Sequence, residues 1–369
     1  DGADIFLNFE NYTLSANADT ANLNAVYGST INGGALSDTA SYSTVGAALT
    51  VTINSGNTSA TVSDGTSTDT LQNIEKIIGG DGDDTFIASN VAGINTLDGA
   101  GGTNTLQLSG DQLDLSSVTL LNFDTIEVAD GKTLTLNAKE LSGKDIDISL
   151  VGSANLIIVA DASSHDFSNI TLNKTGTADG TVTLDVDINK DISGVNINTF
   201  IDTFDVNSGN TLTLRYAQFD EQVANVQGAG AGTLKLADNT LTGTEIKSVN
   251  DNSENAIDLS NVTTISTATM SQALEIVQNT GSTFTTAANY AVTISDATIS
   301  AANVKLINAD NGTGTIDISA ATTITSSTIA DVLEIVNNTG SVFTTATNYA
   351  VTISDATISA ANVKLINAD

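Results

Sequence analysis

Apolar and polar residues alternate over short runs along most of this chain. The runs Thr125–Val128 (TIEV) and Thr133–Leu136 (TLTL) place every second side chain on one apolar face, which is the period of a half-buried β-strand. Clusters of Asn, Asp, Gly and Ser separate such runs and favour tight turns. The pattern predicts further short strands at the runs IDIS, LIIV, TLDV, TLKL, LEIV, VTIS and VKLI. Segments such as Ala297–Val304 (ATISAANV) are compatible with a short helical turn, but no long stripe of period 3.6 is present.

Internal repeats dominate the second half of the chain. Residues 274–310 and 333–369 lie 59 positions apart and differ at only three pairs of positions, Gln278/Asn337, Thr283/Val342 and Ala288/Thr347. The runs at 257–265 and 316–324 match at the same offset. We therefore expect two repeat units, one at 252–310 and one at 311–369.

A looser repeat is present earlier in the chain. Residues 124–136 (DTIEVADGKTLTL) are similar to residues 202–214 (DTFDVNSGNTLTL), and in both segments two alternating runs flank a glycine-centred turn. Many short strands in a periodic chain favour stacked turns, in which each repeat buries its apolar face on the next. We predict an all-β fold, a right-handed parallel β-roll or β-solenoid. A string of separate β-sandwich domains is the alternative. It ranks second because a 59-residue unit is small for a sandwich.

The end of the chain completes a repeat unit. Solenoids usually close with an atypical polar cap, and the final residues do not differ from those of the preceding unit. We expect either a fragment of a longer protein or a subunit that stacks end to end.

The chain is strongly acidic. Its 43 Asp and Glu residues face 11 Lys and Arg residues, which gives a formal net charge of −32, and 34 of the acids are Asp. Nucleic acid and anionic membranes carry like charge and are repelled, so cations are the expected partners. There is no cysteine for a disulfide, and no apolar run approaches the about 18 residues of a transmembrane helix. The first ten residues do not have the character of a signal peptide, so export would need another signal or one outside this chain.

The segment Ile77–Ile87 (IIGGDGDDTFI) packs three glycines and three aspartates between two apolar runs. Residues 79–87 fit the pattern G-G-x-G-x-D-x-U-x, with U apolar, at every fixed position. Glycines permit a tight turn with inward carbonyl groups, Asp84 supplies a charged oxygen, and Phe86 begins a buried strand. Such oxygen ligands suit Ca²⁺, whereas Zn²⁺ prefers His and Cys, which are nearly absent. The alternative is an ordinary acidic surface turn.

This segment resembles the RTX family of haemolysin-type calcium-binding repeats. The resemblance covers roughly residues 1–108, where other segments are similar to that family's repeats: Gly2–Phe6 (GADIF), Asn32–Ser43 (NGGALSDTASYS), Asp69–Glu75 (DTLQNIE) and Leu97–Leu106 (LDGAGGTNTL). It implies a degenerate calcium β-roll at 1–110. The looser repeats predict a β-solenoid with diverged repeats at 111–251.

The resemblance also implies a metal site. In the family, calcium lies between turns on the same side of the roll, which makes residues 79–87 face residues 99–107. The implied site residues are Gly79, Gly80, Asp81, Gly82, Asp83, Asp84, Asp98, Gly99, Gly102 and Asn104. Departures from the pattern predict one good site rather than a ladder of sites. The repeat that contains Asp38 has Leu36 in a glycine position and Ala40 in the apolar position, which argues against a site there.

No catalytic motif is evident. His165 is the single histidine, so neither a zinc-protease motif nor a Ser-His-Asp arrangement can be assembled. The glycine run at 228–232 lacks the Lys-Ser/Thr that follows in a phosphate-binding loop. We predict that this chain is not an enzyme.

Composition and repeats together resemble RTX-class bacterial S-layer proteins exported by type I secretion. The resemblance implies an extracellular, cell-surface structural protein whose copies assemble into a lattice or filament when calcium offsets their charge. Two alternatives stay open: the spacer region of a large secreted RTX adhesin, and the non-catalytic C-terminal part of a secreted RTX enzyme. The expected partners are further copies of the chain and cell-surface polysaccharide, and neither nucleic acid nor a transmembrane segment is expected.

Overall fold

The computed structural model describes most of the chain: residues 4–5, 10–53, 59–162, 166–176, 180–195, 197, 201–219, 225–227 and 232–368. The chain divides into two compact units. The first comprises residues 1–185 with 195–203, and the second comprises residues 186–194 with 204–369. The finer boundaries expected at residues 110, 251 and 310 stay predictions.

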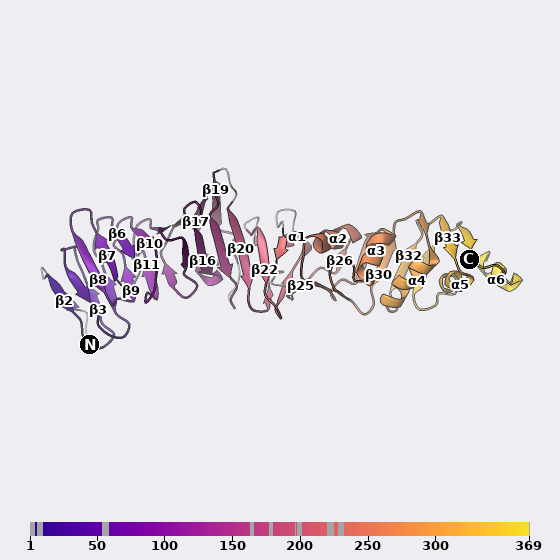
Figure 1. Cartoon of the computed structure of the whole chain (residues 1–369), viewed down its shortest axis with the longest axis horizontal. Helices are drawn as coiled ribbons and strands as arrows, with labels where there is room; N and C mark the ends of the chain where they lie inside the picture. Colours follow the sequence, from indigo (N-terminus) through magenta and orange to yellow (C-terminus); the bar gives the residue numbers. More distant parts are fainter. Residues whose placement is uncertain are drawn as a thin grey trace. The chain divides into compact units, whose positions relative to one another are not determined.

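Short strands in stacked sheets build the first unit (Figure 1). One sheet has the order β1 (Asp4–Ile5), β3 (Thr20–Asn22), β5 (Thr39–Ser41), β9 (Lys76–Ile78), β11 (Thr96–Asp98) and β14 (Thr119–Leu121). The largest has the order β19 (Ile170–Thr175), β17 (Ile146–Val151), β15 (Thr125–Val128), β12 (Thr105–Leu108), β10 (Thr85–Ala88), β6 (Thr50–Ile53), β7 (Ser59–Ser63), β8 (Thr68–Gln72), β4 (Thr30–Asn32) and β2 (Asn11–Thr13). A third contains β13 (Gln112–Asp114), β16 (Thr133–Asn137), β18 (Asn155–Val159) and β20 (Thr181–Val186), and the 3₁₀-helix η1 (Ala138–Glu140) follows β16.

Neighbouring strands of the first unit come from successive turns of the chain. Thr85 pairs with Thr105, and Thr105 pairs with Thr125, so one turn takes 20 residues here. Thr20 pairs with Thr39 across a turn of 19 residues. All of these pairings are parallel, and each turn adds strands to the same stack. The predicted all-β parallel β-roll or β-solenoid is confirmed.

Every second residue of these strands lies inside the coil. Phe86, Leu106 and Ile126 occupy matching positions on β10, β12 and β15, and all three are fully buried. The rings of Phe86 and Phe123 pack edge to face with their centroids 5.1 Å apart, a favourable aromatic geometry. The alternation in the sequence therefore becomes a continuous column of apolar side chains.

Among the described strands of this unit, one antiparallel strand interrupts the parallel stack. Strand β7 pairs antiparallel with both β6 and β8, with Val62 opposite Val51 and Asp69. The period of two does not reveal this reversal, because strands of either direction have the same alternation.

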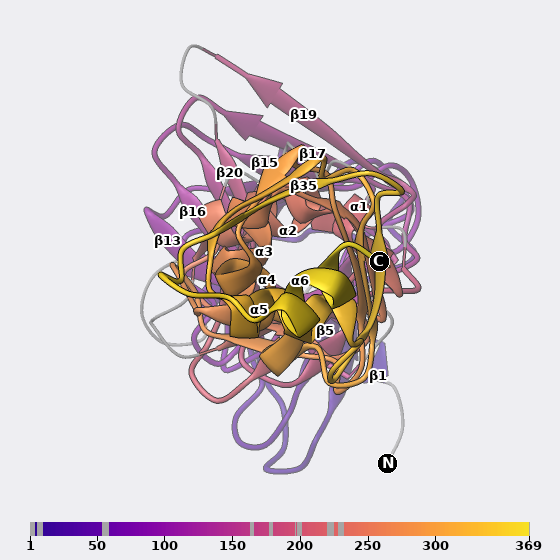
Figure 2. The ribbon, with the colours of Figure 1, turned by 90° about the vertical axis from the view of Figure 1, so that its right-hand side faces the viewer.

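The second unit combines short strands with stacked helices (Figure 2). Its strands are β21 (Lys190–Asp191), β22 (Thr203–Val206), β23 (Thr211–Leu214), β24 (Asn225–Gln227), β25 (Thr233–Leu236), β26 (Thr240–Leu241), β27 (Ala256–Leu259), β28 (Thr264–Ala268), β29 (Phe284–Thr286), β30 (Ala291–Ile294), β31 (Thr298–Ile299), β32 (Thr315–Ile318), β33 (Thr323–Ser327), β34 (Val342–Thr345) and β35 (Ala350–Ile353). Its helices are α1 (Tyr216–Phe219), α2 (Gly243–Asp251), α3 (Met270–Val277), α4 (Ala301–Asp310), α5 (Ile329–Val336) and α6 (Ala360–Ile366). The sheets have the orders β21-β23-β25-β27-β29, β26-β28-β30-β32-β34 and β31-β33-β35.

The runs LEIV and VKLI, predicted as strands, are helical, and this part of the prediction is wrong. LEIV lies in α3 and α5, and VKLI lies in α4 and α6. Hydroxyl side chains cap the helix starts, and Thr269 with Gln272 forms a full capping box at α3. In α4 the buried residues Ala301, Val304 and Ile307 recur at helical spacing. Consecutive helices from α2 to α6 pack on one another, and Figure 2 shows α3 to α6 gathered side by side.

Candidate metal site at a glycine-aspartate corner

A tight turn joins β9 to β10 and contains the glycine-aspartate segment. It lies between the corresponding turns of the preceding and following coils. The Asp81 N–H donates to the Val45 carbonyl oxygen at 2.7 Å, and the Gly101 N–H donates to the Gly80 carbonyl oxygen at 2.9 Å. A β-carbon on Gly82 would lie 2.7 Å from the backbone of the preceding turn, so the close stacking requires glycine at this position.

Asp84 binds backbone groups of two turns. Its Oδ1 accepts the Leu49 N–H at 2.7 Å, its Oδ2 accepts the Gly80 N–H at 2.6 Å, and the residue is 1% exposed. The Asp84 N–H in turn donates to Asn104 Oδ1 at 3.0 Å, and the Asn104 N–H donates to Asp124 Oδ2 at 2.7 Å. The acid and amide side chains thus form a ladder that links four successive turns at one corner.

Two acceptor oxygens face the same point beside Gly79. Asp84 Oδ2 and the Gly99 carbonyl oxygen both lie within 2.7 Å of the place where a β-carbon on Gly79 would stand. An ionised carboxylate and a carbonyl have no proton to share, so the arrangement favours a cation or a protonated acid. At the next turn the Asn104 Nδ2 donates to the Asn122 carbonyl oxygen at 3.0 Å. At Asn104 an amide N–H therefore meets the carbonyl oxygen, whereas at Asp84 a carboxylate oxygen and a carbonyl oxygen share the same space.

Asp38 occupies a corner of similar sequence at the opposite edge of the stack, where the chain passes from β4 to β5. Its Oδ1 accepts the Asp19 N–H at 2.8 Å, whereas its Oδ2 is buried without a hydrogen-bond partner. That Oδ2 and the Asn73 carbonyl oxygen both lie within 2.8 Å of the point where a β-carbon on Gly33 would stand. Leu36, which stands in a glycine position, adopts the left-handed conformation with φ 71°, so the turn persists despite its side chain.

The sequence pattern argued against a site at Asp38. In the structure, however, Asp38 Oδ2 has no hydrogen-bond partner, whereas both carboxylate oxygens of Asp84 accept one. The five-residue spacing from Gly33 to Asp38 equals that from Gly79 to Asp84, and this spacing was the available signal. Leu36 and Ala40, which depart from the pattern at its glycine and apolar positions, obscured this spacing.

The ten residues predicted for the metal site lie on the two neighbouring coils that were expected to face each other. They differ in burial: Gly79, Gly80, Asp84, Gly99 and Asn104 are buried, Gly82 and Asp98 are half-buried, and Asp81, Asp83 and Gly102 are exposed.

The outer carboxylates hold turns together. Asp83 Oδ1 accepts the Thr103 N–H at 2.8 Å, and Asp98 Oδ1 accepts a hydrogen bond from Asn122 Nδ2 of the next turn at 2.7 Å. Within the described residues, no three His, Cys, Asp or Glu side chains converge as ligands of one metal ion. A cation at Asp84 would therefore depend on backbone carbonyl oxygens for most of its ligands, and the individual ligand roles stay predictions.

Burial raises the pKa of both corner carboxyls. For Asp84, burial is the largest cause, the hydrogen bonds from Gly80 and Leu49 lower the pKa, and the charge of Asp83 raises it. For Asp38, burial again raises the pKa most, the hydrogen bond from Asp19 lowers it, and the negative charge of Asp19 raises it. Both corners therefore favour neutralisation of the carboxylate, by a proton or by a bound cation.

Comparison with known proteins gives no match to a family model, to a curated protein or to a solved structure. In the described part of the chain, no helix combines the length and apolar character needed to cross a membrane. His165 and residues 228–231 lie outside the described residues.

Replacement of Asp84 by alanine should lower the free energy of unfolding of the first unit by about 2–5 kcal/mol, because two buried N–H groups lose their acceptor. Urea unfolding in chelator measures this loss. Asp83→Ala is the matched control, since Asp83 is exposed and its single backbone contact is open to water. Equal losses for the two variants would contradict the structural role of Asp84.

The raised pKa of Asp38 predicts a pH dependence of stability. The folded state holds the Asp38 proton more tightly than the unfolded state, whose pKa is near 3.8, so this contribution is present at pH 4 and is lost as pH rises through the folded pKa. Unfolding free energies of the wild type and Asp38→Asn, measured in chelator from pH 4 to 7, should therefore differ more in favour of the wild type at low pH. A constant difference, or one of opposite slope, would exclude this linkage.

Proposed function

We propose that this chain is a structural protein of the extracellular surface of bacteria, an S-layer or filament subunit whose calcium-roll region is stabilised by Ca²⁺. The observation that carries the proposal is the buried corner carboxylate of Asp84, whose Oδ2 accepts the Gly80 N–H and shares the space beside Gly79 with a second acceptor, the Gly99 carbonyl oxygen. Oxygen ligands of this kind suit a hard divalent cation.

Calcium would join neighbouring coils. Asp84 with backbone carbonyl oxygens would hold the ion, and the exposed Asp81 and Asp83 would add negative charge close to it. When bound, the ion supplies two positive charges where oxygens from successive turns meet. Because extracellular calcium modules commonly bind with Kd near 10⁻⁴–10⁻³ M, the site would be empty inside cells and filled outside.

The repeats support a scaffold. Each turn buries the apolar face of its neighbour, so added turns lengthen the stack without needing a new type of core. The net charge of −32 opposes close association of copies, and bound divalent cations reduce this repulsion. Type I secretion and attachment to cell-surface polysaccharide belong to the same proposal.

A spacer region of a large secreted adhesin, or a non-catalytic C-terminal part of a secreted RTX enzyme, would use the same stacked turns. Both alternatives require calcium binding but no ordered assembly, so assembly distinguishes them from the proposed lattice or filament.

Calcium at 10 mM should raise the melting temperature of the first unit by about 3–6 °C, as expected for a Kd of about 1 mM. Asp84→Asn should abolish this increase, because it removes the charge while keeping a side chain that the equivalent corner at Asn104 accommodates. Asp145→Asn, at an exposed position of the same unit, is the charge-matched control. If Asp84→Asn does not fold, the double variant Asp81→Asn/Asp83→Asn replaces it and should reduce the increase. A full calcium response in these variants would remove the proposed site.

Electron microscopy of the purified chain should show ordered sheets or filaments in millimolar calcium that dissolve in chelator. Copies with a large negative charge repel one another until the cation binds. Monodisperse particles in both conditions would rule out the lattice and favour the spacer alternatives.

A further inference from the structure

The strand β13 begins the third sheet of the first unit, and one of its two edges has no described strand beside it. On its other edge it pairs with β16, where the Leu115 N–H donates to the Thr135 carbonyl oxygen at 2.8 Å. Hydrogen bonds to one neighbour alternate along a parallel strand, so the backbone groups of Gln112 and Asp114 point away from β16. No described residue forms a hydrogen bond with these backbone groups.

This edge is open because the coil gains a side here. In one coil the seven residues 89–95 connect β10 to β11, whereas in the next coil the ten residues 109–118 connect β12 to β14 and include β13. The shorter connection contains no strand that could pair with β13. A groove of about 380 Å³ remains between the two connections, and we call it the β13 groove. It is lined by residues 89–94, 112–114 and 117.

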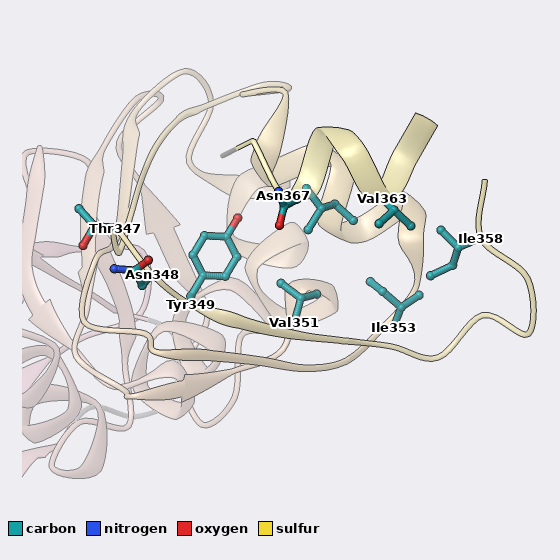
Figure 3. A pocket seen from close by; sticks show the side chains of 9 residues that line it. Thr347, Asn348, Tyr349, Val351, Ile353, Ile358, Val363 and Asn367 are labelled. Atoms are coloured by element: carbon teal, nitrogen blue, oxygen red, sulfur yellow. The ribbon is translucent and has the colours of Figure 1, made fainter. Parts of the chain in front are cut away.

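The β13 groove differs from the cavity of about 440 Å³ in the last repeat, which Figure 3 shows beside Val351, Ile353 and Val363. Described turns lie on one side of that cavity, whereas they lie on both sides of the β13 groove. The shape of the β13 groove is therefore set by the fold around it.

The sequence that forms β13 recurs twice in the second unit. Residues 113–119 (LDLSSVT) match residues 257–263 (IDLSNVT) and 316–322 (IDISAAT). In all three copies the aspartate Oδ1 accepts the N–H of the serine two positions later, at distances from 2.8 to 2.9 Å. The three copies therefore share one local structure, and the neighbours of one copy can be compared with those of another.

In the second unit a preceding parallel strand covers this edge of the motif. β25 covers β27 and β30 covers β32, and in both pairs buried apolar residues stand opposite each other. The Ala256 N–H, the counterpart of the open Gln112 N–H, donates to the Gly232 carbonyl oxygen at 3.2 Å. The covered copies therefore define what fits beside β13, which is one short extended segment in parallel orientation.

The aspartate of the motif favours a basic residue opposite it. Lys235 stands directly opposite Asp258, and its Nζ lies 3.0 Å from Asp258 Oδ2. Asp114, the counterpart of Asp258, is exposed, and none of the residues that line the β13 groove is basic. A basic residue opposite Asp114 would add a favourable cross-strand pair. The net charge of −32 disfavours a second copy of this chain as the occupant.

We infer that the β13 groove binds one extended segment of a second polypeptide as a parallel strand beside β13. The segment has an apolar residue opposite Leu113 and a Lys or Arg opposite Asp114. All 11 Lys and Arg residues of this chain lie in its described part, and none lines the groove, so a second polypeptide supplies the basic residue. This inference goes beyond the proposed scaffold and does not rest on the calcium site.

A dye-labelled peptide of residues 232–237 (GTLKLA), the segment that covers β27, is the probe. The folded chain does not present this segment, because β25 lies between β23 and β27. Fluorescence anisotropy with the 369-residue chain in chelator should show saturable binding. Asp114→Asn, which keeps an acceptor for the Ser116 N–H, should weaken binding by about threefold or more. Asp145→Asn, at an exposed position of the same unit, is the charge-matched control.

Methylation of single peptide nitrogens tests the strand geometry directly. In the folded chain the Thr233 N–H donates to the Asn210 carbonyl oxygen, away from β27, so the Leu234 N–H points toward β27 and the Lys235 N–H points away. A peptide methylated at the Leu234 nitrogen should therefore bind about tenfold more weakly, because the hydrogen bond to β13 is lost. Methylation at the Lys235 nitrogen should have a much smaller effect. The protein is unchanged in this comparison, so misfolding cannot account for the result.

Absence of binding, equal effects of the two methylations, or equal binding by Asp114→Asn and Asp145→Asn would overturn the inference. Dimers of the chain that form in chelator and that the peptide dissociates would also overturn it, because a second copy would then be the occupant. Calcium-dependent stability and assembly are measured separately, so this inference and the proposed function can each fail alone.

Discussion

A coil of parallel strands must satisfy the backbone N–H groups at its corners, where the ladder of the sheet stops. Here side chains from the following turn do so repeatedly: Asp84 accepts from Leu49, Asp38 accepts from Asp19, and Asp69 accepts from the Ser29 N–H at 2.7 Å. A buried N–H without a partner costs free energy, so these acceptors set how closely and in what register one turn stacks on the next. Closed corners of this kind hold successive turns in the register in which the apolar columns lie inside the coil.

This constraint explains why one residue can serve both folding and cation binding. A carboxylate has more acceptor positions than the two N–H groups that Asp84 receives, so negative charge remains at a buried corner beside a carbonyl oxygen. Asn104 shows the neutral solution, in which the amide donates to the carbonyl oxygen of the next turn. The choice between Asp and Asn at a corner therefore decides whether that corner needs a counter-charge, while the geometry of the coil stays the same.

The periodicity of two predicted the short strands, and the internal repeats with the motif spacing predicted the parallel coil, in which inward residues such as Phe86 and Leu106 pair in the indicated register. It failed for LEIV and VKLI, since four residues read alike in a strand and in a short helix, and the deciding signals were the capping residues Thr269 and Ser300 upstream. The open oxygen of Asp38 could not be predicted from pattern matching. It depends on which N–H groups the folded turn brings within reach.

In the second unit, polar side chains on neighbouring helices join successive turns. Each repeat therefore carries residues for its contact with the turn before it and with the turn after it. Asn308 on α4 and Glu334 on α5 belong to successive turns, and each is useful only when the other turn is in place. The three differences between the near-identical repeats spare Asn308, Lys305 and their counterparts Asn367 and Lys364. Leu306 and Leu365 point out of the interface and remain exposed in both copies, whereas Val304 and Val363 differ in exposure. The same side chain is therefore buried or exposed according to whether a following turn packs on its helix, and not according to the sequence of the repeat.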